Sequence, residues 1–326
     1  MEYRRLGDSG LSVSVLGLGG NNFGMRLGET ETQAVVEAAL DAGVTLFDTS
    51  DSYGESEVLL GKALRGRRDE VVIATKFGSP REGRVDEDDP VRSARGGRRY
   101  VRQAVERSLA RLGTDWIDLY QLHFPDPITP VGETLEALTE LVQEGKVRYI
   151  GCSNLSAWQV TDAVWTSRAR GLQQFISAQN EYSLLARGVE LELIPALESL
   201  GLGLLPYFPL ASGLLTGRYR RGESPPTGSR LDSWGLSSLL TDRTFDVVEG
   251  LEDLAERAGA TLLEVAFGGL TAQPSVASVI AGVTSVDQLV ANVEAVEWMP
   301  GAETLAALRA VSGRTEERFS VVAAFG

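Results

Sequence analysis

Three side chains that can carry charge or a proton stand where short apolar runs end. They are Asp48, Lys76 and His123, and Tyr53 follows five residues after Asp48. A tyrosine with its ordinary pKa of about 10 is a weak acid at neutral pH, but a neighbouring ammonium group such as Lys76 lowers that pKa. An ammonium group at the rim of a core needs a partner, and Asp48 can supply the negative charge. These residues predict a tyrosine general acid activated by a lysine–aspartate pair.

His123 is the only histidine and Cys152 the only cysteine of the chain. Without a second histidine or a cysteine pair, a transition-metal site is not expected. A neutral imidazole at a strand end can instead hydrogen-bond a substrate carbonyl. Cys152 has no matching base, so we interpret it as a small buried residue, and a single cysteine excludes an intrachain disulfide.

Each of these residues also has a purely structural interpretation. Asp48 and Lys76 could be an ion pair that closes the top of a core, and Tyr53 could be a loop residue packed over its rim. A single histidine is often a structural residue whose hydrogen bonds are satisfied. The charged residues at several strand ends favour the chemical interpretation, because packing alone does not require them.

Short apolar runs alternate with amphipathic stretches, as in a parallel sheet with crossover helices. The expected strands are residues 15–18, 45–48, 71–75, 117–122, 147–151, 175–179, 203–207 and 277–281. The expected helices are residues 31–42, 57–64, 100–112, 131–144, 156–167, 190–199, 244–258 and 286–295, with Ser156 as a helix N-cap and Gly43, Gly113, Gly145 and Gly201 at helix ends. Eight such units predict an α/β fold, a (β/α)8 TIM barrel, because a closed barrel leaves no edge strand.

Two further elements complete the expected architecture. Residues 3–6 and 12–14 flank a turn-forming segment and predict an N-terminal β-hairpin across the barrel floor. Residues 302–311 predict an extra C-terminal helix. No Gly/Ser or Pro linker marks a second domain, so residues 1–326 are expected to form one domain. The long connections 77–99 and 209–242 both follow strands, at the end of a barrel where active sites lie.

The amino-acid composition limits the classes of partner that the protein is expected to bind. Thirty-one Lys and Arg against 45 Asp and Glu give a net charge of −14, which disfavours nucleic acid and anionic membrane surfaces. No run of apolar residues is long enough to span a membrane. We therefore expect a cytoplasmic protein with a small-molecule substrate, no nucleic acid or membrane partner, and a monomeric or weakly oligomeric state.

Several motifs, in order along nearly the whole chain, resemble the aldo-keto reductase family. They are Phe-Asp-Thr-Ser-Asp-Ser-Tyr-Gly at 47–54 with Ser56 and Glu57, Thr75-Lys76, residues 108–112 leading to 118–123, residues 145–154, and residues 209–217. The resemblance implies reduction of an aldehyde or ketone to an alcohol, with hydride from a nicotinamide. It also implies that Tyr53 donates the proton, that Lys76 and Asp48 lower its pKa, and that His123 positions the substrate.

The resemblance further implies a dinucleotide site built from strand ends. The implied contacts are Gly20, Asn21, Asp48, Ser153, Asn154, Gln179, Tyr207, Phe208, Leu210, Ser212, Gly213, Leu215, Arg218, Arg230, Gly282, Thr284, Gln288 and Asn292. Among them, Ser153, Asn154 and Gln179 correspond to groups that bind the carboxamide, and Tyr207 to an aromatic ring that stacks on the nicotinamide. Segment 208–218 resembles a pyrophosphate clasp, where small residues let backbone amides approach phosphates.

Cofactor preference follows from the residues expected near the adenosine. Arg230, Thr284 and Gln288 can meet a 2′-phosphate, so NADP is favoured over NAD. The turn at 282–284 nevertheless lacks the Lys or Arg found in strongly NADPH-selective branches. No metal is implied.

Other features bear on the substrate and on alternative functions. Trp234 and Phe124 are expected as apolar walls of the substrate pocket, and Asn21-Asn22 replaces bulkier residues and predicts a more polar pocket. Two alternatives remain open. One is a sugar or polyol dehydrogenase working in the reverse direction. The other is a nicotinamide-binding regulatory subunit, because the motifs are also similar to the potassium-channel β-subunit branch.

Overall fold

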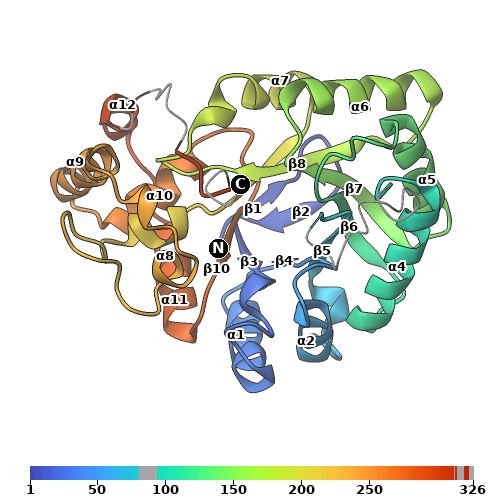
Figure 1. Cartoon of the computed structure of the whole chain (residues 1–326), viewed down its shortest axis with the longest axis horizontal. Helices are drawn as coiled ribbons and strands as arrows, with labels where there is room; N and C mark the ends of the chain where they lie inside the picture. The colour runs from blue at the N-terminus through green and yellow to red at the C-terminus, as the bar shows by residue number, and fades with distance from the viewer. Residues whose placement is uncertain (81–93, 312, 314–318, 323–326) are drawn as a thin grey trace.

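Eight parallel strands form a nearly closed barrel in the computed structural model, which describes residues 1–80, 94–311, 313 and 319–322 (Figure 1). The strands are β3 (Leu16–Gly19), β4 (Leu46–Asp48), β5 (Val72–Phe77), β6 (Ile117–Leu122), β7 (Val147–Ser153), β8 (Phe175–Glu181), β9 (Gly203–Tyr207) and β10 (Val279–Gly282). Strands β3 to β9 pair in sequence order and β10 pairs with β3. The barrel is completed by Leu204, which hydrogen-bonds Ser275 and Ala277 just before β10. The predicted TIM barrel is confirmed.

Helices surround the barrel and connect its strands (Figure 1). Those that flank it are α1 (Glu29–Asp41), α2 (Ser56–Ala63), α4 (Arg98–Leu112), α5 (Val131–Gln143), α6 (Ala157–Arg170), α7 (Leu193–Leu200), α10 (Leu262–Thr271) and α11 (Val286–Val296). Their ends follow the predicted signals: Ser156 and Gln159 form a capping box at α6, and Gly113 and Gly201 end α4 and α7 in the left-handed conformation. Residues 81–93 of the long connection expected at 77–99 lie outside the described residues.

The helix predicted at residues 244–258 was expected to be the barrel helix between the last two strands, and this placement was wrong. That helix exists as α9 (Asp242–Ala258), but it packs with α12 (Ala302–Val311) outside the barrel, and α10 is the helix next to α11 and β10. The sequence did not reveal α10 because it is buried almost all round and has no polar face. A Cβ on its Gly268 would lie 2.7 Å from the Trp298 ring, and one on Gly269 would lie 2.9 Å from Leu184, so close packing requires glycine at both positions.

The predicted N-terminal hairpin is confirmed and fills the barrel floor. Strands β1 (Tyr3–Arg5) and β2 (Ser12–Ser14) pair antiparallel, and Leu6 and Val13 pack on barrel residues. The inward-facing residues of that apolar layer include Leu46, Ala74 and Leu119. Side chains alternate along a strand, so the residues two positions further on face the same interior nearer the mouth. Those residues are Asp48, Lys76 and Gln121, which makes the next layer polar.

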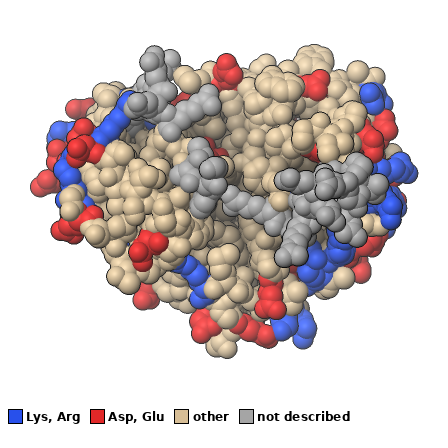
Figure 2. Space-filling view, viewed as in Figure 1, with Lys and Arg blue, Asp and Glu red and all other residues tan. Residues whose placement is uncertain are grey.

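Most of the charged side chains that are drawn in colour on the face seen in Figure 2 lie toward its margin. No helix in the described ranges is both long and apolar enough to cross a membrane.

Candidate active site

A buried ion pair occupies the polar layer at the mouth of the barrel. Lys76 Nζ lies 2.6 Å from Asp48 Oδ1 and donates a second hydrogen bond to Thr49 O at 2.8 Å. Gln179 Nε2 donates to the other oxygen of Asp48 at 2.8 Å. Burial by itself lowers the pKa of Lys76, but the charge of Asp48, with a contribution from Tyr53, leaves that pKa above its ordinary value. Lys76 is therefore a cation at neutral pH although its side chain is almost fully enclosed.

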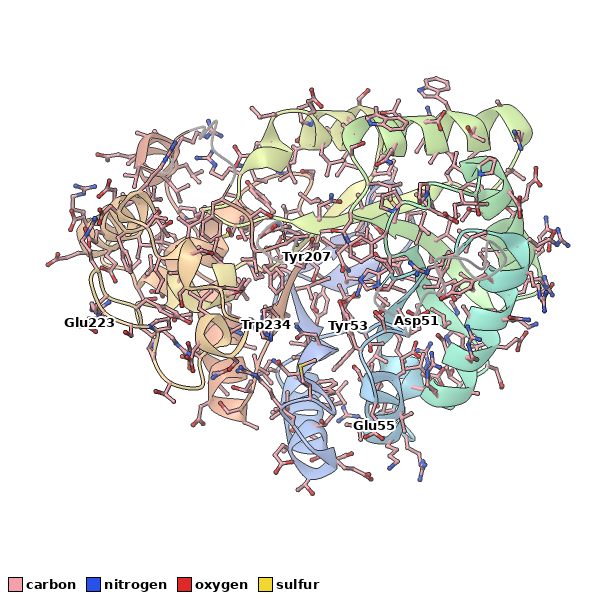
Figure 3. All side chains as sticks on the ribbon, in the orientation of Figure 1. Asp51, Tyr53, Glu55, Tyr207, Glu223 and Trp234 are labelled. Atoms are coloured by element: carbon pink, nitrogen blue, oxygen red, sulfur yellow. The ribbon has the colours of Figure 1, made fainter. Side chains whose placement is uncertain are left out.

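Tyr53 lies on the turn that follows β4, directly over this pair. Lys76 Nζ is 5.0 Å from the centroid of the Tyr53 ring, and the ring meets His123 edge-on with centroids 5.8 Å apart. The turn is held by hydrogen bonds from Tyr53 N–H to Ser50 O and from Ser56 N–H to Tyr53 O. Figure 3 shows Tyr53 near the centre of the mouth, together with Tyr207 and Trp234 from distant parts of the chain.

A second buried carboxylate fixes the helix that starts just after Tyr53. Glu57, in the first turn of α2, accepts hydrogen bonds from Thr75 Oγ1 and from Arg111 Nε, both at 2.6 Å. Thr75 precedes Lys76 on β5, so Glu57 joins the Tyr53 segment to the strand of the cation. In the sequence, Glu57 stands out only as part of a motif, and that motif does not predict this role.

His123 is held from two sides at the end of β6. Its Nδ1 atom lies 3.1 Å from Ser50 Oγ, and its ring stacks on Phe124 with centroids 4.8 Å apart. Both His123 and Tyr53 border the cavity at the mouth of the barrel. The structure therefore brings the four predicted catalytic residues together from β4, the following turn, β5 and β6.

A cavity of about 710 Å³ opens at this mouth, within the usual size range of ligand sites. Every predicted cofactor contact borders it except Gly20 and Leu215. Leu215 is fully buried in the hydrophobic core, and Gly20 packs on Ser56 and the Asp48 backbone. Lys76 also does not border the cavity, because it lies beneath Tyr53.

The side chains expected at the nicotinamide end bind one another. Tyr207 Oη donates to Asn154 Oδ1 at 2.6 Å, and Asn154 Nδ2 donates to His123 O at 2.9 Å. Ser153 Oγ donates to the Gln179 carbonyl oxygen at 2.8 Å. This network places a polar wall beside the four predicted catalytic residues.

The segment predicted to clasp phosphates has the conformation of a backbone cradle. Ser212 and Gly213, within the 3-10 helix η4 (Ala211–Thr216), both have positive φ, 58° and 99°. Ser212 Oγ is buried and has no hydrogen-bond partner in the described part of the chain. A buried hydroxyl without a partner is costly, and a ligand oxygen would satisfy it.

Arg230, at the start of α8 (Arg230–Ser233), provides a positive charge at the edge of the cavity. Burial, together with repulsion from Arg26, lowers its pKa to about 10, so it remains protonated at neutral pH. Its guanidinium lies 4.8 Å from the centroid of the Trp234 ring and donates to Asn22 Oδ1. No Asp or Glu of the described residues forms an ion pair with it. An anionic ligand group would therefore be its natural counter-charge.

The remaining predicted residues contact different parts of the cavity wall. Trp234 and Asn22 contact Arg230, and Asn22 Nδ2 also donates to Val283 O. Phe124 stacks on His123. Gln288 Oε1 accepts from both the backbone and the hydroxyl of Thr284, which orders the turn before α11.

Two cavity residues had no signal in the sequence. Arg26 hydrogen-bonds Ser233 across the opening at 3.0 Å, and it follows no recognisable motif. Val322, near the end of the described chain, also borders the cavity. Its neighbours Ser320 Oγ and Val321 N–H donate to Glu181 at 2.5 and 2.6 Å, and burial raises the pKa of that carboxyl group.

Cys152 is fully buried, with Sγ 3.6 Å from Ser177 O, and burial raises the pKa of its thiol. Its interpretation as a small buried residue is confirmed. In the ranges that the structure describes, no cluster of three or more His, Cys, Asp or Glu side chains is arranged to hold a metal ion.

Comparison with known proteins identifies similar sequences over nearly the full length. Residues 15–312 match the model of the Aldo/keto reductase family. A probable voltage-gated potassium channel subunit beta of Oryza sativa subsp. japonica is 36% identical over 311 residues, 92% of each chain. The uncharacterized oxidoreductase YrpG of Bacillus subtilis is 36% identical over 335 residues, 98% of this chain and all of the other. Versiconal hemiacetal acetate reductase of Aspergillus parasiticus is 35% identical over 322 residues, 90% and 93% of the two chains.

Proposed function

Because this chain belongs to the aldo/keto reductase family of oxidoreductases, we propose that it reduces an aldehyde or ketone to an alcohol, with NADPH as the favoured cofactor. The observation that carries the proposal is the position of Tyr53, whose ring centroid is 5.0 Å from the buried ammonium of Lys76 at the edge of the cavity. A phenol beside a permanently charged, water-shielded cation is suited to give up a proton.

In the proposed reaction, Tyr53 Oη donates its proton to the carbonyl oxygen of the substrate. A nicotinamide bound in the cavity supplies the hydride. Lys76 stabilises the phenolate that remains, and Asp48 keeps Lys76 charged and in place. The His123 imidazole hydrogen-bonds the carbonyl oxygen and orients it. A positioned general acid of this kind contributes about 10² to 10⁴-fold to the rate.

The polar groups along the cavity support a phosphate-bearing cofactor. Ser212 Oγ and the positive-φ backbone at 212–213 can bind the pyrophosphate. Arg230 supports the preference for NADP, since a buried guanidinium without a carboxylate partner gains most from a 2′-phosphate.

Arg230→Met is expected to weaken NADPH binding by roughly 10- to 150-fold. A hydrogen bond to a charged group contributes about 1.5–3 kcal/mol, and the loss of that free energy corresponds to this change in the dissociation constant. NADH, which lacks the 2′-phosphate, should lose much less affinity. Titration of protein fluorescence with each cofactor measures both dissociation constants. Arg220→Met is the matched control, because Arg220 is exposed and pairs with Glu252. Equal losses for NADPH and NADH would contradict a 2′-phosphate contact.

The proposed activity is tested by following NADPH and NADH oxidation at the nicotinamide absorbance with a panel of aldehydes, ketones and sugars, and the reverse reaction with alcohols and polyols. Reduction of a carbonyl compound, faster with NADPH, is the expected result. Turnover only in the oxidative direction would favour the sugar or polyol dehydrogenase. Tight cofactor binding with no turnover in either direction would overturn the proposal and favour a nicotinamide-binding regulatory subunit.

A further inference from the structure

The Ser50 hydroxyl contacts the imidazole of His123. We propose that Ser50 is a positioning residue that holds His123 in the tautomer with the proton on Nε2, so that the imidazole can donate a hydrogen bond to the substrate carbonyl. The proposal rests on the reductase function above. It also assigns a role to a side chain that lies between Asp48 and Tyr53.

The geometry around Ser50 is defined by short contacts inside the protein. Ser50 is fully buried, and its Oγ lies 3.1 Å from His123 Nδ1. The same oxygen lies 3.0 Å from Ser52 Oγ and accepts a hydrogen bond from Ser52 N–H at 3.2 Å. Ser50 Oγ also makes a longer hydrogen bond, to Asp51 Oδ1 at 3.3 Å.

Counting protons favours one direction for the Ser50 hydroxyl. A serine oxygen accepts two hydrogen bonds and donates one. Ser52 offers two donors, its backbone N–H and its hydroxyl, and these can fill both lone pairs of Ser50 Oγ. The Ser50 proton then needs an acceptor. The hydrogen bond to Asp51 Oδ1, at 3.3 Å, is longer than an ordinary O–H···O hydrogen bond, and His123 Nδ1 is the nearer acceptor, at 3.1 Å.

The direction of the Ser50 hydroxyl determines which ring nitrogen of His123 carries the proton. If Nδ1 accepts the Ser50 proton, the neutral ring carries its own proton on Nε2, the nitrogen that would meet a carbonyl oxygen. In the opposite tautomer, Nε2 would present a lone pair to that oxygen and repel it. Stacking on Phe124 fixes the plane of the ring, and Ser50 fixes its proton.

Nuclear magnetic resonance tests the tautomer directly, because His123 is the only histidine and its ring signals need no assignment by mutation. Two-bond ¹⁵N–¹H correlations of ¹⁵N-labelled protein identify the protonated nitrogen at a pH where the ring is neutral. We expect the Nε2–H tautomer with and without NADPH. A wild-type spectrum with the proton on Nδ1 would overturn the proposal, and this measurement does not depend on the folding of any variant.

Ser50→Ala removes the donor and leaves the backbone turn. Its Nδ1 resonance should move, and both tautomers should become populated. In carbonyl reduction, kcat/KM should fall about two- to tenfold, as for one ordinary hydrogen bond, mainly through KM. The dissociation constant for NADPH should not change. Ser278→Ala is the matched control, because Ser278 is equally buried, precedes β10 at the opposite end of the barrel, and has no partner for its hydroxyl in the described residues.

An imidazole spectrum that is identical in wild-type protein and Ser50→Ala would overturn the proposal. The outcome is separable from that of the reductase function, because the tautomer is measured without turnover. If no carbonyl compound is reduced yet the spectrum depends on Ser50, the proposed function fails while the structural control of His123 stands.

Discussion

Tyr53→Phe is expected to reduce kcat for carbonyl reduction by about 10² to 10⁴-fold, since it removes the proposed proton donor. The phenyl ring keeps the edge contact with His123, whereas the hydrogen bond between the Tyr53 hydroxyl and Lys76 is lost together with the proton donor. The dissociation constant for NADPH should therefore stay close to the wild-type value. Steady-state rates and fluorescence titration on the same preparation measure the two quantities.

The matched control is Tyr3→Phe. Tyr3 also loses a hydroxyl that donates a hydrogen bond, to Gly43 O, but it lies on the hairpin at the barrel floor. This variant should keep wild-type kinetics. If Tyr53→Phe kept a near-normal kcat, another group would have to be the acid and the proposed mechanism would be abandoned.

Lys76→Met is expected to affect both turnover and stability. The phenolate left by proton transfer would have no cation beside it, and Asp48 would lose its counter-charge in a site that is 3% exposed. Removing one partner of a buried ion pair lowers the free energy of unfolding by about 3–5 kcal/mol. Urea unfolding should therefore give a lower free energy of unfolding by that amount, and carbonyl reduction should fall close to background.

The double variant Asp48→Asn, Lys76→Met separates these two effects. Removing both charges should recover much of the stability, because no uncompensated carboxylate remains, but activity should stay lost. Lys146→Met is the control for loss of a lysine ion pair at the surface, where Lys146 contacts Glu106 and Glu144. Its cost should be at most about 1 kcal/mol. Recovery of activity in the double variant would show that Lys76 is structural.

The pH dependence of the Lys76 contribution has a definite sign. The pKa of Lys76 is raised in the folded protein, so the folded state binds its proton more tightly than the unfolded state does. The stabilisation is fully present below the ordinary lysine pKa and is lost as the pH rises through the folded pKa. Between pH 6 and pH 8, about two or more units below the ordinary lysine pKa, this stabilisation is complete, so Lys76 should add no pH dependence to the free energy of unfolding measured there.

The strands were predictable from the sequence, whereas one barrel helix was not. Buried strands appear as short apolar runs, and all the predicted runs became strands. Helix α10 is equally apolar but lies between α9, α11 and the barrel, so it lacks the polar face that periodicity detects. Its two glycines, Gly268 and Gly269, argue against a helix when the sequence is considered alone. In the structure they are required by the close approach of Trp298 and Leu184 from other parts of the chain.

The sequence by itself determined which polar side chains lie at the mouth of the barrel. Alternation along each strand places Asp48 and Lys76 on the inward face, and parallel strands bring their carboxyl ends to one rim. Only the tertiary structure decided the contacts between segments that share no pattern: Ser50 on His123, Glu57 on Thr75 and Arg111, and the burial of Arg230 without a carboxylate partner in the described residues. The alternation of residues along a strand fixes which face each of its side chains points to, and this can be read from one segment alone. A hydrogen bond or a buried charge depends instead on which side chains of other segments the fold brings within a few ångströms.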